Sequence, residues 1–503
     1  MAGHRRTVWN ITANSAGVLV SMLSGLLVMP YLIQTLGNST YGLWILIGSL
    51  TGYFGVLDLG ISAAVGRLIA AHRARGELEQ VNEVMSTACA LLMIVFVVVC
   101  LATCVVLVVF PLLFDITAER IWDVRYSLIL VGLTLAFAFP ASIYMGFLWG
   151  HERFDLQNAI EIPALTLRTA LSLTMVSATH PLTSLGVITF GVTACSAAAR
   201  MIVCARLEPR LRVSWSHVRR SKIREIFSIG GWMNVISWSR TLIPQIAPTL
   251  IGMRLGTSAV TSFAVARQLV TYTDIFANSA TQVMAPRAIA AYATKAVAAQ
   301  TRLFMEGGRF AYALTIFIGG GLFCLGKPFI HWWQHGLQDG SYRLLVILML
   351  GETLPMSQWL TYSVLLGANR QRALAFLAVT EAVIAFTLIV TLMHSGGLTG
   401  VCVGVALSGF LVRGLIRWLY GCRLTGVRPY VYVRSVFVPV TIAAIPPVAA
   451  LYCATVAIAP GTFLALLLIG ASYFVLYAAI IGCVFVGYSR IKSFLWSLVP
   501  STK

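Results

Sequence analysis

The sequence predicts an all-α polytopic membrane protein with about fourteen transmembrane helices, and two observations support this fold class. The chain of 503 residues is 58% hydrophobic and only 11% charged, whereas soluble domains carry roughly 25% charged residues. Apolar segments of about 20 residues, the length that crosses a bilayer, follow one another along the whole chain. A water-facing globule could not bury so much apolar surface, so lipid is the expected solvent.

The expected spans are joined by short connections. They cover residues 8–36, 40–66, 84–113, 126–149, 157–179, 184–205, 227–253, 257–286, 303–326, 343–367, 373–395, 398–420, 435–458 and 462–487. Spans well over 20 residues long are expected to tilt or to extend past the lipid. The first span is longer than the apolar region of a signal peptide and shows no clear cleavage site, so we expect it to be retained.

Basic residues are divided unequally between the two sets of loops that these spans create. One set includes both termini and the basic stretch "RLEPRLRVSWSHVRRSKIR" (206–224). The other set holds only Arg120, Arg125, Arg254, Lys327 and Arg343. Cytoplasmic loops carry the excess of Lys and Arg, so both termini are expected in the cytoplasm. This topology, with contacts to anionic lipid headgroups, accounts for the net charge of +19 without a nucleic-acid partner.

An internal repeat with an offset near 220 residues relates the two halves of the chain. "NSAGVLVSMLSGLLVMPYLIQTLG" (14–37) and "NVISWSRTLIPQIAPTLIGMRLG" (234–256) both begin at Asn and end at Leu-Gly. Six spans in each copy give both copies the same orientation, with a substrate site expected between them. The predicted organisation is an N-terminal six-helix lobe (1–210), a cytoplasmic link (211–226), a C-terminal six-helix lobe (227–425), and two additional spans with a short cytoplasmic tail (426–503).

Three motifs in the first lobe carry a family resemblance. "LGNSTYGLW" (36–44), "GYFGVLDLGISAAVGRLIA" (52–70) and "VNEVMSTACALL" (81–92) resemble the polysaccharide-transporter branch of the multidrug/oligosaccharidyl-lipid/polysaccharide (MOP) superfamily. The resemblance implies a Wzx-type flippase of the bacterial inner membrane. Such a flippase moves polyprenyl-diphosphate-linked oligosaccharides by alternating access, for surface polysaccharide, lipopolysaccharide or exopolysaccharide biosynthesis. It also implies membrane lipids, a polymerase and chain-length proteins as partners.

Polar side chains inside the spans are the candidates for a substrate site. Arg267, Thr271, Asp274, Asn278 and Gln282 are spaced by three or four residues and therefore share one helical face. A polar face of this length in lipid should meet a wet cavity or another helix. Similar stripes run along the first and seventh spans, and the seventh also contains Pro244 and Pro248, where a bend for opening and closing is expected.

Guanidinium groups grip phosphate bidentately, so arginines in these spans suit a diphosphate. The substrate-binding candidates are Arg240, Arg267, Asp274, Asn278, Gln245, Asn14, Asp58 and Arg168. Asp58 is included because its "LDLG" matches the family motif, although it could equally cap or pair helices. Arginines nearer the cytoplasmic ends are expected to extend their head groups to the interface. These are Arg200, Arg309 and Arg413.

A structural ion-pair network is the alternative explanation for the intramembrane arginines. Five carboxylates also lie in the apolar segments, namely Asp58, Glu161, Asp274, Glu352 and Glu381. Arg267 and Asp274 are two turns apart and could be linked through a neighbouring helix, and Arg168 is two turns from Glu161. Both explanations stay open at this point.

A flippase for another polyprenyl-linked glycan, such as a peptidoglycan precursor, stays open, although the first-span arginines expected there are absent. Two functions of other kinds compete with the flippase. A drug or cation antiporter of the same fold usually carries a carboxylate in the first span, and this chain has none there. A membrane polymerase or glycosyltransferase usually displays a sizeable outer loop with catalytic groups, and the expected outer loops are short. No Walker motif, kinase signature or CxxC pair is present, so we expect no enzymatic activity, no catalytic residues, no cofactor and no metal site.

Overall fold

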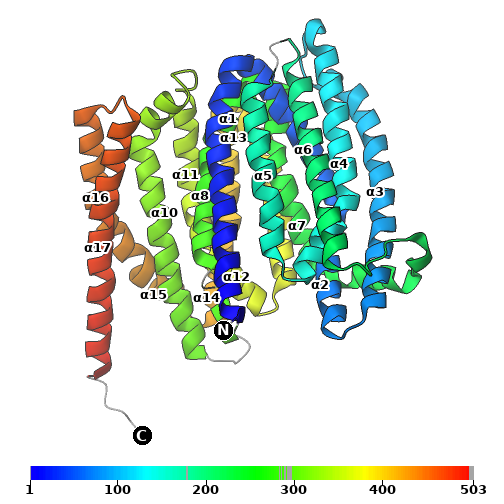
Figure 1. Ribbon diagram of the computed structural model, residues 1–503. Helices are drawn as coiled ribbons and strands as arrows, with labels where there is room; N and C mark the ends of the chain where they lie inside the picture. Colours follow the sequence, from blue (N-terminus) through cyan, green and yellow to red (C-terminus); the bar gives the residue numbers. More distant parts are fainter. Residues whose placement is uncertain are drawn as a thin grey trace. The chain divides into compact units, whose positions relative to one another are not determined.

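The computed structural model describes residues 2–176, 179–282, 284, 286–287, 290–291 and 297–497, without the side chains of residues 2–15, 50–51, 229–231, 233 and 486–497. All regular elements in this part of the chain are helical (Figure 1). Contacts divide the chain into two compact units, unit 1 (Met1–Thr261) and unit 2 (Ser262–Lys503).

Unit 1 contains seven long or medium helices and three short 3-10 turns among its described residues. Their bounds are α1 (Ala2–Phe54), η1 (Gly55–Asp58), α2 (Ile61–Ala74), α3 (Leu78–Leu113), η2 (Ala118–Arg120), α4 (Ile121–Gly150), α5 (Phe154–Thr174), α6 (Pro181–Leu207), η3 (Trp215–His217) and α7 (Arg220–Leu255). Helix α7 therefore groups with unit 1. The predicted lobes follow a repeat in the sequence, whereas the two units follow contacts in space. The units therefore do not test the predicted lobe boundaries, which stay a prediction.

Unit 2 begins within α8 and contains two π-helical segments. The bounds are α8 (Thr257–Gln282), α10 (Val297–Trp333), α11 (Ser341–Ser357), α12 (Trp359–Gly367), α13 (Gln371–Gly409), η4 (Phe410–Ile416), α14 (Arg417–Thr425), α15 (Pro429–Tyr432), η5 (Val433–Phe437), α16 (Val438–Ile458) and α17 (Phe463–Ser497). The π-helices are η4 and η5.

The predicted all-α polytopic fold class is confirmed. Nine helical segments of the described chain are long and apolar enough to cross a membrane. Two of these segments each cover two predicted spans, and their backbone leaves helical geometry at Gly37 (φ 77°) and Gly397 (φ 53°). Helices α5, α7 and α8 cover three further predicted spans, whose polar residues lower their hydropathy.

The predicted continuous span 40–66 is wrong in one respect, because the helix is interrupted after Phe54. A short 3-10 turn follows, and then Leu59 and Gly60 adopt positive φ values of 51° and 73°. Residues with positive φ cannot continue a right-handed helix. The side-chain amide of Asn234 in α7 donates to the Leu59 carbonyl at 2.7 Å, which satisfies a backbone group that the interruption exposes.

Glycines of the family-like motif allow α7 to approach α1 and η1 closely. A Cβ at Gly52 would lie 2.8 Å from Cδ of Gln245, and one at Gly60 would overlap the Asn234 side chain. Small residues let a neighbouring helix in lipid approach closely, and here the glycines make room for side chains of α7. The motif "GYFGVLDLG" therefore serves helix packing in this structure.

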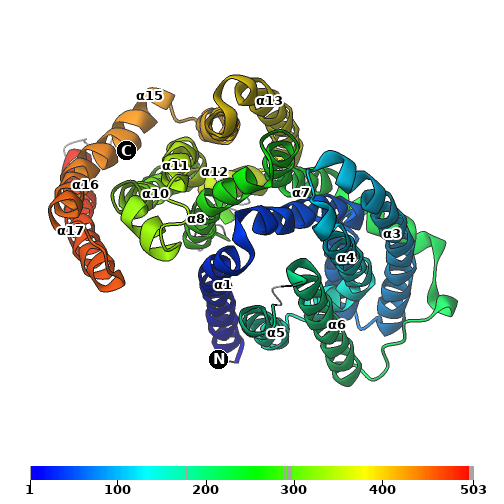
Figure 2. The same cartoon turned by 90° about the horizontal axis from the view of Figure 1, so that it is seen from above.

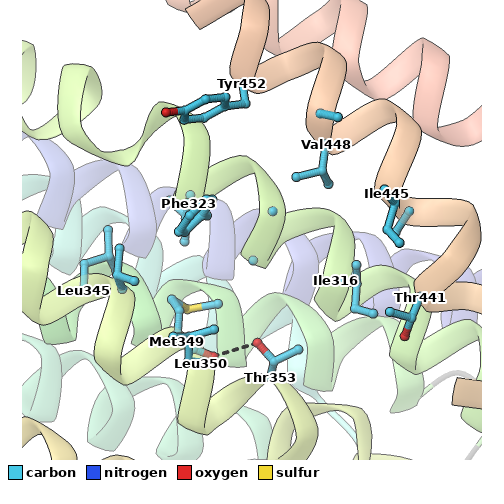
Figure 3. A pocket seen from close by; sticks show the side chains of 16 residues that line it. Ile316, Phe323, Leu345, Met349, Leu350, Thr353, Thr441, Ile445, Val448 and Tyr452 are labelled. Carbon is cyan, nitrogen blue, oxygen red and sulfur yellow. Dashed lines mark hydrogen bonds between the residues drawn. The ribbon is translucent and has the colours of Figure 1, made fainter. Parts of the chain in front are cut away.

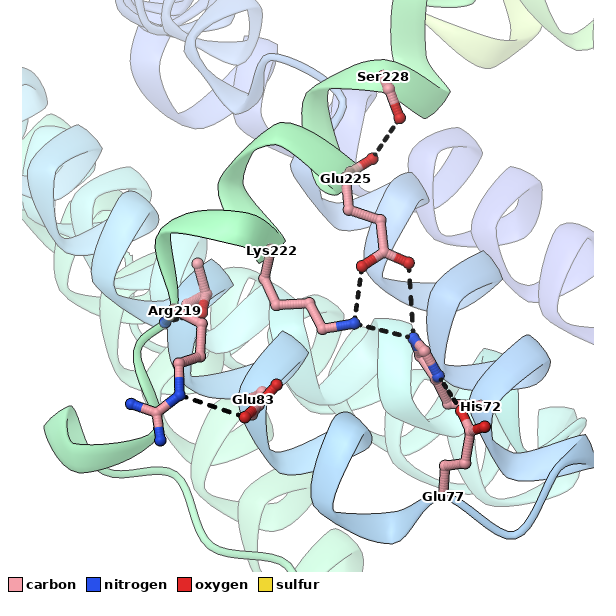
Figure 4. A network of polar contacts seen from close by, with 8 residues as sticks. His72, Glu77, Glu83, Arg219, Lys222, Glu225 and Ser228 are labelled. Atoms are coloured by element: carbon pink, nitrogen blue, oxygen red, sulfur yellow. Dashed lines mark hydrogen bonds and ion pairs between the residues drawn. The ribbon is translucent and has the colours of Figure 1, made fainter.

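A polar network fastens the start of α7 to α2 and α3 (Figure 4). Lys222 Nζ donates to Glu225 Oε2 at 2.7 Å and to His72 Nε2 at 3.2 Å. The other ring nitrogen of His72 lies 2.7 Å from Glu77, and this hydrogen bond lowers the pKa of the Glu77 carboxyl below its ordinary value. The preceding connection is held on α3, where the backbone N–H of Arg219 donates to Thr87.

The two additional C-terminal helices, α16 and α17, pack against α10 within unit 2 (Figure 2). Tyr473 and Tyr477 donate their hydroxyls to the carbonyls of Phe317 (2.9 Å) and Ala313 (2.7 Å) in α10. Buried hydroxyls need such partners. These bonds fix the position of α17 on α10.

The glycine contact in unit 1 leads to a test by substitution. Gly60→Ala should destabilise the protein by roughly 1–3 kcal/mol, because a Cβ is strained at positive φ and would overlap Asn234. The melting temperature of the detergent-purified protein and its abundance in membranes measure this effect. Gly48→Ala is the matched control in α1, since a Cβ there meets nothing within 4 Å. Equal stability of the two variants would contradict the packing role.

Candidate functional site

Helix α8 carries the candidates Arg267, Asp274 and Asn278 in unit 2. All three side chains are partly buried. Arg267 is the most informative, because 30% of its side chain is exposed although it lies in the middle of α8. An arginine at such a position needs a partner or water.

The partner of Arg267 is Glu352 of α11, which also binds a second arginine. Arg267 Nη1 lies 3.4 Å from Glu352 Oε1, and Arg413 Nη2 lies 2.8 Å from the same oxygen. Arg413 Nε reaches Glu381 Oε1 of α13 at 2.6 Å. The carboxylates are almost fully buried, with side-chain exposures of 2% for Glu352 and 5% for Glu381. We call these four residues the unit 2 ion network.

The expectation that Arg413 extends to the interface is wrong. It lies in the π-helix η4, where the extra residue per turn alters the direction of the side chains. Gly409 gives it room, because a Cβ there would lie 2.7 Å from Arg413 Nη2. Both carboxylate partners of Arg413 were recognised as intramembrane carboxylates from the sequence, but their pairing with Arg413 was not predicted. The available signal was that a carboxylate in a span requires a cation nearby.

Two other expectations about intramembrane arginines are also corrected. Arg309 is 7% exposed and donates two hydrogen bonds to the Ser435 carbonyl, at 3.1 and 2.7 Å. Glu306, one turn before Arg309 on the same helix, binds Arg302 at 3.0 Å. Arg200 forms an ion pair with Glu161 within unit 1, and its side chain is only 13% exposed. These arginines are held by partners because an unpaired charge away from water is costly.

Asp274 is held by an aromatic residue. Trp359 Nε1 of α12 donates to Asp274 Oδ1 at 2.8 Å. The ion pair of Arg267 is with Glu352, and Asp274 has its own hydrogen bond, so the two residues are joined to different neighbours. Asn278 lies one turn further along α8 and accepts a long hydrogen bond from Gln282, at 3.4 Å.

The remaining candidates belong to unit 1 and are distributed over several elements. Arg240 is exposed on α7, and Gln245 packs against Gly52. Asp58, in η1, accepts a hydrogen bond from Ser62 at 2.6 Å. Arg168 donates to Thr193 at 3.2 Å and not, as the ion-pair alternative suggested, to Glu161. Asn14 lies in α1, but its side chain is outside the described residues.

An apolar pocket of about 540 Å³ lies within unit 2, between α10, α11 and α16 (Figure 3). Ile316, Phe323, Met349 and Val448 are among the residues that line it. On α11, Met349 and Thr353 face this pocket while Glu352 belongs to the ion network. One helix therefore separates an apolar pocket from a charged cluster. Among the described residues, no group of three His, Cys, Asp or Glu side chains could hold a metal ion.

Long apolar helices, paired intramembrane charges and an apolar pocket define a multi-pass membrane protein of transporter architecture. The model of the family described as "Polysaccharide biosynthesis protein" matches residues 7–292, more than half of the chain. The chain therefore belongs to this family. The predicted relationship to the polysaccharide-transporter branch of the MOP superfamily is thereby confirmed.

Two curated relatives agree with this assignment. The chain is 21% identical to an uncharacterized membrane protein EpsK of Bacillus subtilis (strain 168), with 86% of each chain covered. It is 20% identical to a putative O-antigen transporter of Shigella flexneri, with 83% of this chain and 97% of the relative covered.

Solved structures show the same fold at low sequence identity. A lipid II flippase MurJ in an inward closed conformation has a TM-score of 0.70 at 12% identity and covers 94% of this chain and 98% of its own. An inward-facing multidrug resistance MATE family transporter of the MOP superfamily has a TM-score of 0.65 at 13% identity, covering 84% and 94%. These similarities establish the MOP-type fold.

The unit 2 ion network leads to a prediction about Arg413. Arg413→Met should lower the abundance of the protein in membranes, because it leaves buried Glu381 without its cation, at a cost of roughly 3–5 kcal/mol. Adding Glu381→Gln should restore part of the abundance. Arg302→Met is the control, since Arg302 is 72% exposed and an exposed ion pair contributes at most about 1 kcal/mol. An Arg413→Met variant as abundant as the control would show that the pair is not structural.

Proposed function

We propose that the protein is a flippase that translocates polyprenyl-diphosphate-linked oligosaccharides across the bacterial inner membrane by alternating access. It has no enzymatic activity of its own and supplies repeat units for surface polysaccharide or exopolysaccharide. Both termini are cytoplasmic, and membrane lipids surround the spans. A polymerase and chain-length proteins of the same pathway are proposed partners. Family membership and the relative named as a putative O-antigen transporter support this proposal.

The observation that carries the proposal is the partial exposure of Arg267 beside a carboxylate that already has another cation. Among the described residues, Arg267 donates one hydrogen bond, at 3.4 Å, to Glu352. Arg413 binds the same oxygen more closely. A guanidinium has five N–H donors in a fork that fits phosphate oxygens. Arg267 therefore has donors available for an anionic headgroup.

The apolar pocket of unit 2 supports a substrate with a hydrocarbon chain. Its walls are almost entirely aliphatic and aromatic side chains of α10, α11 and α16 (Figure 3). A hydrocarbon chain that enters this pocket gains dispersion contacts with the side chains that line it. A polyprenyl diphosphate combines a long hydrocarbon with two phosphates, and unit 2 offers a surface suited to each.

The geometry of unit 2 argues against a cation as the main substrate. A cation site needs accessible carboxylates, whereas Glu352 and Glu381 are buried and paired with Arg413. A drug or cation antiporter of the same fold predicts a different phenotype for cells that lack the protein, namely sensitivity to cationic drugs. A membrane polymerase or glycosyltransferase would require catalytic groups that we do not identify in the described residues.

The anion role of the arginines gives the main test. Arg267→Ala and Arg240→Ala should each reduce surface glycan by roughly 10- to 100-fold, since a hydrogen bond to a charged group contributes about 1.5–3 kcal/mol. Lipid-linked repeat units should accumulate on the cytoplasmic side at near-normal protein abundance. Arg→Lys should retain part of the export, because it keeps the charge and loses the bidentate fork. Quantified surface glycan, lipid-linked intermediates and immunoblots measure these effects.

Three results would contradict the anion role or the function. Lower abundance of both Arg267→Ala and Glu352→Gln, with abundance and export restored in the double variant, would mark Arg267 as structural. Full export by the Arg267→Ala variant would reject its role as a counter-charge. Cells that lack the protein but make normal glycan and become sensitive to cationic drugs would support the antiporter.

The pocket gives an independent prediction. Val448→Trp should fill the space between α10 and α16 and slow translocation of a full-length polyprenyl substrate several-fold, because a filled pocket cannot take hydrocarbon. A short-chain prenyl analogue should be affected less. Rates in proteoliposomes measure both effects. Val456→Trp is the control on the same helix, because Val456 is 65% exposed and does not line the pocket. Equal slowing by both variants would contradict a role of the pocket.

A further inference from the structure

The unit 2 ion network contains one carboxylate oxygen that two arginines from different elements share. Glu352 Oε1 accepts from Arg413 of η4 at 2.8 Å and from Arg267 of α8 at 3.4 Å. The second oxygen, Oε2, is buried and has no hydrogen-bond partner in the part of the chain that the structure describes. A buried carboxylate oxygen without a donor is costly, so Glu352 holds spare accepting capacity.

The two arginines are held very unequally. Arg413 is bound on both sides, by Glu352 and by Glu381 at 2.6 Å, and Gly409 packs close to its guanidinium. Arg267 has the longer bond, and its side chain is 30% exposed while that of Glu352 is 2% exposed. Arg413 is therefore the fixed cation of the network, and Arg267 is the arginine whose guanidinium can move away from Glu352.

Charge balance makes the departure of Arg267 reversible. With Arg267 in place, two arginines balance Glu352 and Glu381. Without it, Arg413 alone faces two carboxylates, so the cluster carries one net negative charge and attracts the guanidinium back. Asp274, two turns along α8, is engaged by Trp359 at 2.8 Å, which limits its competition for Arg267.

We propose that Glu352 is a positioning residue that exchanges Arg267 with the anionic headgroup of the substrate. It holds Arg267 when the site is empty, yields it to a diphosphate, and takes it back so that the product can leave. Arg413 keeps Glu352 partly neutralised throughout, so that no bare carboxylate remains in the apolar interior. This inference rests on the proposed function. It adds Glu352 as the residue that sets how tightly the protein binds the anionic headgroup and how fast it releases it.

Glu352→Gln separates binding from turnover. The neutral amide holds Arg267 less strongly, so an anion should bind roughly tenfold more tightly, which corresponds to about 1.4 kcal/mol. Release should slow by a similar factor, because the carboxylate that recaptures Arg267 is missing. A lower KM together with a lower kcat distinguishes this role from simple loss of folded protein, which lowers kcat alone.

The experiment uses the full-length protein in nanodiscs and proteoliposomes. Calorimetry with inorganic pyrophosphate gives Kd, and translocation of a polyprenyl-diphosphate-linked oligosaccharide gives KM and kcat. Glu306→Gln is the matched control, because it neutralises a carboxylate of unit 2 that binds the exposed Arg302 and lies outside the ion network. We expect Kd and KM to fall about tenfold in Glu352→Gln and to stay unchanged in Glu306→Gln.

The outcomes separate this inference from the proposed function. Unchanged Kd and KM in Glu352→Gln, with wild-type protein that binds pyrophosphate and transports substrate, would overturn the exchange role alone. Wild-type protein that neither binds pyrophosphate nor transports would overturn both. If Glu352→Gln does not accumulate, Glu352→Asp takes its place, since its shorter side chain loosens Arg267 while keeping the charge. Tighter pyrophosphate binding by Glu352→Asp supports the exchange, and unchanged binding overturns it.

Discussion

The pairing of Arg413 with two buried carboxylates is the interaction on which the interior of unit 2 depends. Charges that lie among apolar helices persist only where their partners are correctly placed. Glu352 comes from α11, Glu381 from α13 and Arg413 from the π-helix η4. One cation therefore joins three elements, and the network restricts how these elements can pack.

The same constraint supports the proposed anion-binding role of Arg267. A lone arginine on α8 would have to reach water or remain poorly solvated, and a fully paired arginine would have no donors available. Arg267 lies between these extremes, with a long bond to a carboxylate that Arg413 already serves. In the proposed exchange, this shared partner lets Arg267 alternate between Glu352 and the anionic headgroup, as a group that binds and releases within one transport cycle must do.

Helix interruptions and glycines shape unit 1 in a comparable way. The break at Leu59 and Gly60 ends one helix and begins another, and Asn234 satisfies the carbonyl that the break exposes. Gly52 and Gly60 then allow α7 to lie close to α1 and η1. Here a sequence motif that resembles a family feature has a direct steric explanation, namely that glycines leave room for the Gln245 and Asn234 side chains of α7.

Much of the architecture could be predicted from the sequence, because hydrophobic length and charge placement are local properties. The apolar segments predicted the all-α polytopic fold, and the motifs within residues 36–92 predicted the family that the match over 7–292 supports. The even spacing from Arg267 to Asn278 correctly indicated one helical face on α8. Only tertiary structure decided which charges meet. Arg413 pairs with Glu352 and Glu381, which are 61 and 32 residues away, and no local pattern encodes a contact that depends on how separate helices pack.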